Sequence, residues 1–323
     1  MKNDYVSIVI LNWNGNKYLS DCIGSIKKQT YSKIDLIIVD NFSTDGSLEY
    51  IRNNDVECVL LENQVNYGFS KGMNIGIEAT NGEFILLLNN DVYLKEDFVE
   101  KCVEKLRSAT EFDSVQGCAY HWENGVRTND VQAGALFLKR RMQGCWLNFS
   151  KSVESFGSNG SFMFLRKSAL DNVIAKSGYA FDEDFETGWE DMDFWFRLQL
   201  FGHRCIYIPN AIAWHVGSAS AGEQKRLIDK DLKYRQRIFR NRLYVIYKNY
   251  TERMNRHMGI WLWLANVLMF PYYLIVSPSS LKARRLAKKE FKLNLDKMKI
   301  KRFLIQENVI VDYEVMKNFF VKF

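Results

Sequence analysis

Residues 84–91 read FILLLNND, an apolar run that ends in two asparagines and an aspartate. Two similar runs precede it, at residues 6–11 (VSIVIL) and 34–39 (IDLIIV), and residues 18–29 between them have apolar side chains at helical spacing. Short apolar runs separated by helical segments are typical of parallel strands buried on both faces. The sequence therefore predicts an α/β fold, doubly wound, with a mostly parallel central sheet flanked by helices.

Polar residues follow each of the three runs directly. The first leads into Asn12, the second into Asp40 and Asn41, and the third into Asn90 and Asp91. Ligands of open α/β sheets bind outside the carboxyl ends of the strands. Turn formation alone explains such residues at any single strand end, but three polar ends together favour one pocket. The Asp40 carboxylate can accept hydrogen bonds from a ribose or a base N–H group.

A fourth candidate segment, residues 66–74 (NYGFSKGMN), carries two glycines that permit close backbone approach. It contains no GxxxxGK[ST] phosphate loop. We expect Asn66, Lys71 and Asn74 to line a nucleotide or sugar pocket.

Asp91 suits a divalent cation beside a diphosphate, because Mg²⁺ usually takes one or two protein carboxylates and completes its shell with phosphates and water. His215, in the run AWHVGS, is a second candidate ligand. The alternative for His215 is a structural role with no ligand.

Residues 188–193 (GWEDMD) open a predicted helix that continues FWFRLQLFG. Asp193 has an i+4 partner in Arg197, whereas Asp191 has no such structural explanation. A sugar transfer with inversion needs one base to accept the proton of the attacking hydroxyl. Asp191 is the candidate for that base; the alternative is that it complements the helix dipole.

Together these segments resemble family 2 glycosyltransferases with the GT-A fold, especially the bacterial rhamnosyltransferase-like branch. The matching segments occur in the family's order over about residues 5–220: VSIVILNWNG, LIIVDNFSTDGS, NYGFSKGMNIGI, LLLNND, GWEDMDFWFRLQLFG and WHVGSAS. The resemblance implies that Asp40 contacts the donor base, that Asp91 is the metal-binding last residue of a DxD-type motif, and that Asp191 is the general base.

The same resemblance makes Glu190 a neighbour that helps to orient the acceptor, and His215 a metal or diphosphate contact. It implies a divalent cofactor, Mg²⁺ or Mn²⁺. The first residue of the DxD-type triplet is Asn89, which leaves metal binding to rest on Asp91. The residues expected to bind the donor nucleotide are Asn12, Asp40, Asn41, Asn66, Lys71, Asn74 and Asn90.

The net charge of +6 is unevenly distributed along the chain. Residues 225–323 hold 23 basic and 8 acidic residues, a net charge of +15, so residues 1–224 carry −9. We expect a catalytic domain at 1–224, with a nucleotide-binding half (1–110) and an acceptor half (111–224), and a helical extension at 225–323. Residues 111–160 lack clear periodicity and are expected to form loops and short strands.

Residues 258–281 contain no charged side chain and have basic flanks. This pattern favours a segment that lies on an anionic membrane surface; the alternative is a buried helix of an accessory domain. The tail matches no nucleic-acid recognition motif, so we expect no nucleic-acid partner. The six cysteines are scattered and the N-terminus lacks a secretory pattern, which favours a cytoplasmic enzyme on the inner face of the cell membrane.

The sequence thus predicts an inverting transferase that moves a sugar, with rhamnose a candidate, from a nucleotide-diphosphate donor to a glycan or lipid-linked glycan in surface polysaccharide synthesis. One alternative is a processive polysaccharide synthase, which usually carries several membrane helices and a QxxRW motif. Another is a catalytically silent carbohydrate-binding or scaffold protein.

Overall fold

The computed structural model describes residues 1–54, 56–123, 125–217 and 227–321. They form two compact units. The first comprises Met1–Leu136, Trp146–Asn172 and His203–Glu223, and the second comprises Phe137–Cys145, Val173–Gly202 and Gln224–Phe323. The second unit therefore groups residues 173–202 with the C-terminal helices, whereas the boundary expected near residue 224 assigns them to the catalytic part.

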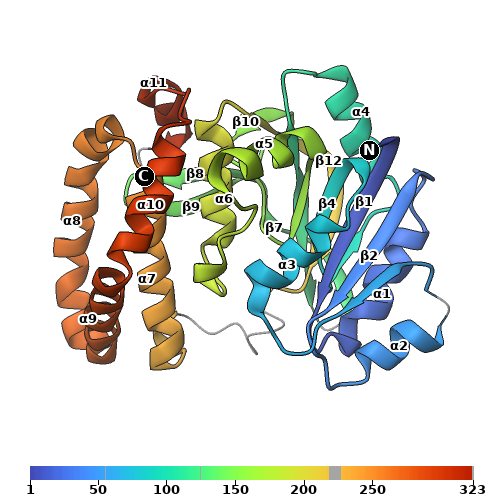
Figure 1. Cartoon of the computed structure of the whole chain (residues 1–323), viewed down its shortest axis with the longest axis horizontal. Coiled ribbons are helices and arrows are strands. Elements are labelled where there is room, and N and C mark those ends of the chain that lie inside the picture. The colour runs from blue at the N-terminus through green and yellow to red at the C-terminus, as the bar shows by residue number, and fades with distance from the viewer. Residues whose placement is uncertain (55, 124, 218–226, 322–323) are drawn as a thin grey trace. The chain divides into compact units, whose positions relative to one another are not determined.

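A twisted sheet forms the centre of the first unit, with strand order β10-β12-β6-β11-β4-β1-β2-β3; β5 pairs with β12 and β7 with β6 (Figure 1). Its strands are β1 (Lys2–Asn12), β2 (Ile34–Asp40), β3 (Val59–Glu62), β4 (Gly82–Asn89), β5 (Val92–Leu94), β6 (Ser114–Glu123), β7 (Val126–Ala133), β10 (Val153–Ser155), β11 (Phe162–Arg166) and β12 (Cys205–His215). Strands β1 to β4 are parallel, and β11 runs antiparallel to both β4 and β6. The predicted α/β class with a mostly parallel sheet is confirmed.

Helices cover both faces of these strands, which explains their continuous apolar runs. The helices of this unit include α1 (Asn16–Lys27), α2 (Ser47–Asn53), α3 (Gly68–Glu78) and α4 (Phe98–Ser108). Ile8 and Ile10 of β1 belong to one core cluster with apolar residues of α1 and α4. Val9, between them, points to the other face, where it lies so close to Gly76 of α3 that a Cβ there would be 2.3 Å from its side chain.

Residues 111–160, expected as loops and short strands, contain a long strand. β6 has ten residues, and it pairs with β12 in parallel and with β7 in antiparallel orientation. The prediction of short strands is wrong for β6. Its polar and small residues, SVQGCAYHWE, do not alternate cleanly, so periodicity did not reveal it.

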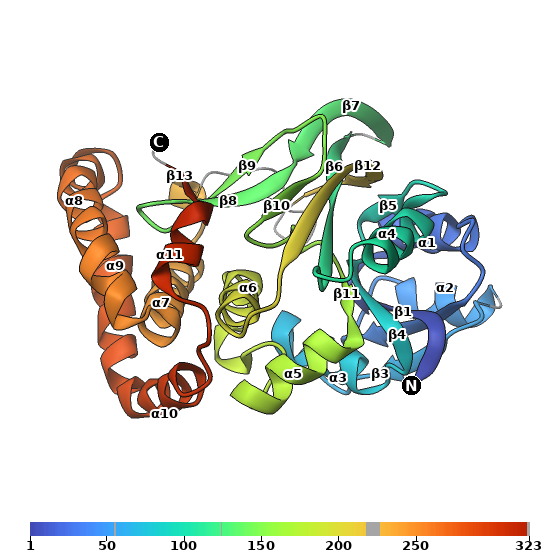
Figure 2. The same cartoon turned by 90° about the horizontal axis from the view of Figure 1, so that it is seen from above.

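The second unit is mostly helical. It contains η1 (Glu183–Phe185), α6 (Glu190–Leu200), η3 (Leu227–Asp229), α7 (Leu232–Asn249), α8 (Glu252–Val276), α9 (Pro278–Leu293), α10 (Leu295–Gln306), α11 (Tyr313–Met316) and η4 (Lys317–Phe319). Helix α7 packs against α6, α9 and α10 (Figure 2). A small sheet, β13-β8-β9, completes it through β13 (Phe320–Val321), β8 (Ala135–Lys139) and β9 (Gln143–Leu147). Helix α5 (Lys167–Ser177), like β8 and β9, has residues in both units.

Helix α8 is exposed along most of its length. Its N-terminal turn is fixed by the Thr251 cap and by buried Met254 and Met258. Beyond them, Trp263 is 59% exposed and Leu268 74% exposed. By length and composition the helix could cross a membrane, and none of its apolar 18-residue window, all of it described, is buried. The alternative of an ordinary buried helix is therefore wrong.

Candidate active site

The polar ends of β1 and β2 meet in one hydrogen-bonded cluster. The Asn12 side-chain amide donates to Asp40 Oδ1 at 2.8 Å and to Ser47 Oγ at 2.9 Å, and Asn12 Oδ1 accepts from the Asn90 amide at 2.8 Å. Gly15 leaves room for this cluster, since a Cβ at that position would lie 2.1 Å from Asn90 Nδ2 and 2.4 Å from Asn12 Oδ1. Parallel pairing aligns Asn12 with Asp40, so the sheet register itself brings the predicted residues together.

Asp40 is buried and held from two sides. Its Oδ1 accepts from Asn12, and its Oδ2 accepts from the Ser43 backbone N–H at 2.9 Å. Asp45 uses both oxygens on the backbone N–H groups of Asn16 and Ser47. Asp45 therefore stabilises the turn that leads into α2, while the role of Asp40 in donor binding stays a prediction.

Asn41 connects the end of β2 to the residue 66–74 segment. Its amide donates to Asn66 Oδ1 at 2.9 Å and to the Gly68 carbonyl at 3.1 Å, and its Oδ1 accepts from the Tyr67 backbone N–H at 3.0 Å. Asn63, which the sequence did not single out, donates to the same Oδ1 at 3.0 Å. Asn41 and Asn66 thus shape the loop that leads into α3.

Lys71 and Asn74 lie on α3, three residues apart and both half-buried. The Lys71 ammonium sits 4.3 Å from the centroid of the Tyr67 ring. This cation–π contact holds the lysine near the start of the helix. Its contact with a donor stays a prediction.

Asp91 and His215 lie side by side at the ends of neighbouring strands. His215 of β12 is in register with Val92 of β5, and the Val216 N–H donates to the Asp91 carbonyl at 3.2 Å. Asp91 Oδ1 is 3.5 Å from His215 Nε2. Among the described residues this buried oxygen has no hydrogen-bond partner, which leaves its lone pairs available.

These two side chains fit a divalent cation. Neighbouring ligands of an octahedral Mg²⁺ with bonds of about 2.1 Å are about 3 Å apart, close to the 3.5 Å between Asp91 Oδ1 and His215 Nε2. Over the described ranges, no group of three or more Asp, Glu, His or Cys side chains gathers at one point. The protein would therefore supply two ligands and leave the others to phosphate and water.

The acidic pair belongs to the second unit, at the first turn of α6. The preceding loop carries left-handed backbone at Glu186 (φ 60°) and Trp189 (φ 76°), which non-glycine residues adopt at a cost. Asn241 of α7 holds this loop: its buried amide donates to the carbonyls of Phe185 (2.8 Å) and Gly188 (2.7 Å). The loop that presents Glu190 and Asp191 is therefore fixed from α7.

Burial dominates the electrostatics of the pair. It raises the pKa of Glu190 to about 8, with a further contribution from the neighbouring Asp191 carboxylate, and it also raises the pKa of Asp191. Asp191 Oδ1 accepts from the Met192 N–H at 2.7 Å, and Glu190 Oε2 has no hydrogen-bond partner among the described residues. A buried carboxylate without a compensating cation is a candidate for proton transfer.

Asp193, two residues further on, is compensated in full. Its Oδ2 accepts from Arg197 Nε at 3.0 Å, as the i+4 spacing predicted. Its Oδ1 lies 3.0 Å from the Lys248 ammonium, which also pairs with Asp182. Hydrogen bonds thus join five of the donor-side candidates in the first unit: Asn12, Asp40, Asn41, Asn66 and Asn90. In the second unit, the acidic pair is distinct from a structural ion cluster.

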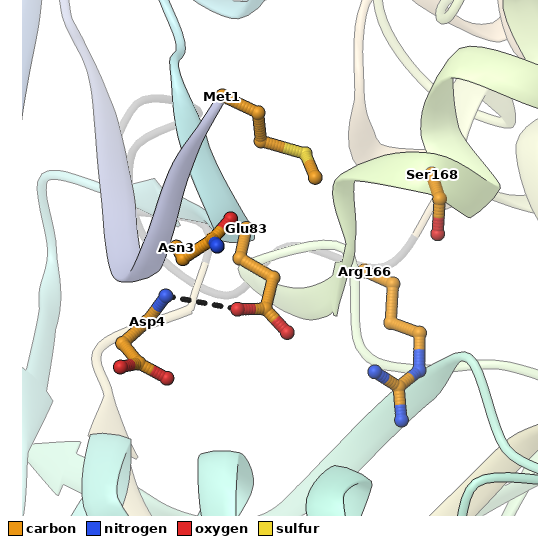
Figure 3. Close-up of a pocket in the computed structure, with 6 residues that line it drawn as sticks. All are labelled: Met1, Asn3, Asp4, Glu83, Arg166 and Ser168. Atoms are coloured by element: carbon orange, nitrogen blue, oxygen red, sulfur yellow. Dashed lines mark hydrogen bonds between the residues drawn. The ribbon is translucent and has the colours of Figure 1, made fainter.

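A pocket lies away from these residues. It has a volume of about 440 Å³ and lies at the amino ends of β1 and β4, lined by Met1, Asn3, Asp4, Glu83, Arg166 and Ser168 (Figure 3). Glu83 accepts from the Asp4 N–H at 2.8 Å, and the Arg166 guanidinium donates to backbone carbonyls. Its polar groups serve the fold, and none of the predicted site residues lines it.

Sequence inspection missed Gln132 and Asn241. Gln132 of β7 contacts His215 from 83 positions away along the chain, and Asn241 reaches the acidic loop from 53 to 56 positions away. Neither lies in a motif, and only the pairing of β6 with β7 or the packing of α7 on α6 reveals them.

Comparison with known proteins agrees with this arrangement. Residues 7–174, just over half of the chain, match the family described as glycosyl transferase family 2. The glycosyltransferase GlyG of Streptococcus pneumoniae serotype 4 (strain ATCC BAA-334 / TIGR4) is 26% identical over 196 residues, which cover 56% of this chain and 63% of GlyG. The chain thus matches less than two thirds of that relative's length.

Two solved structures share the GT-A fold. GalNAc-T7 with UDP, GalNAc and Mn²⁺ superposes with a TM-score of 0.62 at 13% identity, covering 91% of this chain and 57% of that one. The mannosyltransferase PcManGT from Pyrobaculum calidifontis, in complex with GDP-Man and Mn²⁺, gives 0.56 at 16% identity, covering 94% and 86%. The sheet described above, and the match over residues 7–174, show that this chain belongs to glycosyl transferase family 2.

Proposed function

We propose that this chain is an inverting glycosyltransferase that moves a sugar from a nucleotide-diphosphate donor to a hydroxyl of a glycan or lipid-linked glycan in surface polysaccharide synthesis. The main support for the proposal is the geometry of Asp91 at the carboxyl edge of the sheet. Its Oδ1 is buried, has no hydrogen-bond partner among the described residues, and lies 3.5 Å from His215 Nε2. Membership of the family supports the reaction class.

On the donor side, the base and ribose would bind beside the Asn12–Asp40–Asn90 cluster and the Asn41 loop. Asp91 and His215 would hold a divalent cation, Mg²⁺ or Mn²⁺, which supplies positive charge to the diphosphate leaving group. The complexes of GalNAc-T7 and PcManGT with Mn²⁺ support such a cofactor.

On the acceptor side, we assign the base role to Asp191. Its carboxylate takes the hydroxyl proton as the acceptor oxygen bonds to the anomeric carbon and the bond from that carbon to the diphosphate oxygen breaks. Glu190, whose pKa burial raises, stays protonated at neutral pH and can donate a hydrogen bond to the acceptor. Rhamnose is the first sugar to test, because of the six ordered segments that resemble the rhamnosyltransferase-like branch.

The test is a donor-hydrolysis screen of the purified protein against nucleotide sugars, with and without Mn²⁺ or Mg²⁺. We expect turnover that needs the cation, and Asp91→Asn should weaken cation-dependent donor binding at least tenfold by calorimetry. Asp97→Asn, which alters a half-buried ion pair with Lys101, is the matched control. Unchanged donor affinity in Asp91→Asn would rule out Asp91 as a metal ligand. If no nucleotide sugar is hydrolysed, a carbohydrate-binding role is favoured.

We further propose that the chain is cytoplasmic and binds the inner face of the cell membrane through α8 and α9. Apolar side chains are exposed on α8, including Trp263, Leu268 and Ile275. The next helix exposes Lys282, Arg285, Lys288, Lys289 and Lys292. An apolar face beside cationic residues matches the chemistry of an anionic lipid surface.

Vesicle flotation tests the proposed membrane binding through α8 and α9. We expect binding to phosphatidylserine-containing vesicles to exceed binding to phosphatidylcholine vesicles and to fall with salt. The double variant Trp263→Ser with Leu268→Ser should lose most of the binding, whereas Trp146→Ser, which alters an exposed tryptophan of β9, should not. Equal flotation of all three proteins would refute the membrane role of α8.

A further inference from the structure

Four neighbouring strands bring one glutamine between two histidines. His215 of β12 is in register with His121 of β6 on one side and with Val92 of β5 on the other, and β7, which carries Gln132, pairs with β6. Gln132 thereby reaches both imidazoles: its Oε1 is 2.8 Å from His215 Nδ1, and its Nε2 is 3.4 Å from His121 Nδ1.

The orientation of the Gln132 amide is fixed by a third contact. Gln132 Nε2 is 3.2 Å from the His215 backbone carbonyl. A carbonyl oxygen can only accept a hydrogen bond, so the amide NH₂ must face it, and Oε1 must face His215 Nδ1. Because Oε1 is an acceptor, Nδ1 carries the imidazole proton.

This tautomer determines whether the Nε2 atom of His215 that faces Asp91 carries a proton or a lone pair. With the proton on Nδ1, a neutral imidazole has a lone pair on Nε2, and that lone pair lies 3.5 Å from Asp91 Oδ1. Two acceptors then face each other, and Oδ1 has no hydrogen-bond partner among the described residues. In the other tautomer the Nε2–H group would point at Asp91 Oδ1, and neither His215 Nε2 nor Asp91 Oδ1 would be free to bind a cation.

The backbone leaves space for this amide. Gly217 has φ +73°, and a Cβ there would lie 2.9 Å from Gln132 Nε2 and 3.9 Å from His215 Cε1. A side chain at residue 217 would therefore both strain the backbone and push the amide away from the histidine.

We propose that Gln132 is a positioning residue that holds His215 in the Nδ1–H tautomer and so prepares Nε2 and Asp91 Oδ1 to bind a divalent cation. The inference rests on the proposed cation site. Hydrogen-bond partners of metal-binding histidines typically change metal affinity by about 10–100-fold when they are lost. It follows that Gln132 controls cation affinity without touching the cation.

The first measurement needs no metal and no substrate. Two-bond proton–nitrogen NMR of protein labelled with ¹⁵N-histidine, at about pH 8, well above the ordinary histidine pKa of about 6.5, reports which ring nitrogen is protonated. We expect the Nδ1–H pattern for His215 in the wild type, and a shift towards Nε2–H in Gln132→Met. An Nε2–H wild type, or an unchanged pattern in Gln132→Met, would overturn the proposal.

The second measurement is titration with Mn²⁺ alone, followed by the electron paramagnetic resonance signal of the free ion. Gln132→Met should raise the dissociation constant about 10–100-fold, and Gln132→Glu, which keeps an acceptor for Nδ1–H, should stay much closer to the wild type. Equal weakening in both variants would contradict the tautomer role. If the wild type binds no Mn²⁺ while its NMR pattern is Nδ1–H, the cation site fails and the role of Gln132 in selecting the tautomer still holds.

Discussion

Two pairs of carboxylates lie within twelve residues of each other in the second unit, and they have opposite surroundings. Asp182 and Asp193 are buried against Lys248, with Lys301 and Arg197 as further partners. Glu190 and Asp191 are surrounded by no such cation among the described residues, and their pKa values rise. Burial alone therefore does not mark a functional acid; a buried carboxylate that lacks compensating charge is the stronger candidate.

The sign of the pKa shift separates the two pairs. Burial by itself raises the pKa of Asp182, but the ammonium groups of Lys248 and Lys301 outweigh it and hold that pKa well below its usual range. Asp182 therefore stabilises the fold above the unfolded-state pKa of about 3.9, and the stabilisation is lost as the pH falls towards the folded-state value. Glu190 changes stability with pH in the opposite direction. Because its folded-state pKa lies above the unfolded-state pKa, its contribution to stability falls as the pH rises.

Removing the lysine that Asp182 and Asp193 share should have the strongest consequence for stability. Lys248→Met leaves Asp182 and Asp193 buried with reduced compensation, and we expect the free energy of unfolding to fall by about 3–5 kcal/mol. Urea denaturation at neutral pH measures it. Lys297→Met, which removes an exposed partner of Asp184, is the control, with an expected loss below about 1 kcal/mol. Similar midpoints for the two variants would show that the buried cluster is not structural.

The next effect comes from the uncompensated pair. Asp191→Asn removes the proposed base but no ion pair among the described residues, so kcat should fall about 10²–10⁴-fold while donor affinity and the unfolding midpoint stay near wild type. Transfer assays and donor calorimetry measure the two quantities. Asp193→Asn should instead lower stability first, because it disrupts the contacts with Lys248 and Arg197. Loss of donor binding equal to the loss of rate would remove Asp191 from the base role.

The smallest effect is a pH-dependent change in stability. Between the unfolded-state pKa of about 4.3 and the folded-state value of about 8, native Glu190 binds more protons than the unfolded chain, so wild-type stability falls as the pH rises. Glu190→Gln removes this cost. We expect its melting temperature to exceed the wild-type value by a few degrees at pH 9 and by much less at pH 5. A gain of the same size at both pH values would contradict the raised pKa.

Much of the donor side could be predicted from the sequence, because its residues directly follow recognisable strands. Parallel strands bring their carboxyl ends to one edge, so the residues that follow residues 6–11, 34–39 and 84–88 had to meet once the strands were recognised. The Asn12–Asp40 and Asn12–Asn90 hydrogen bonds confirm that convergence. The i+4 pair of Asp193 and Arg197 was predictable in the same way, because helical spacing fixes it.

Local patterns in the sequence were sufficient to predict the α/β class, the polar strand ends and the acidic start of α6, because alternating periods, turn residues and helix spacing act over a few positions. The sequence did not show that Gln132 sets the hydrogen bond of His215 or that α8 is exposed. Nor did it show that Lys248 compensates Asp193 while Asp191 has no cation beside it among the described residues. These facts depend on strand register and helix packing between residues dozens of positions apart. Charge compensation and burial are properties of a three-dimensional neighbourhood, and no local pattern encodes them.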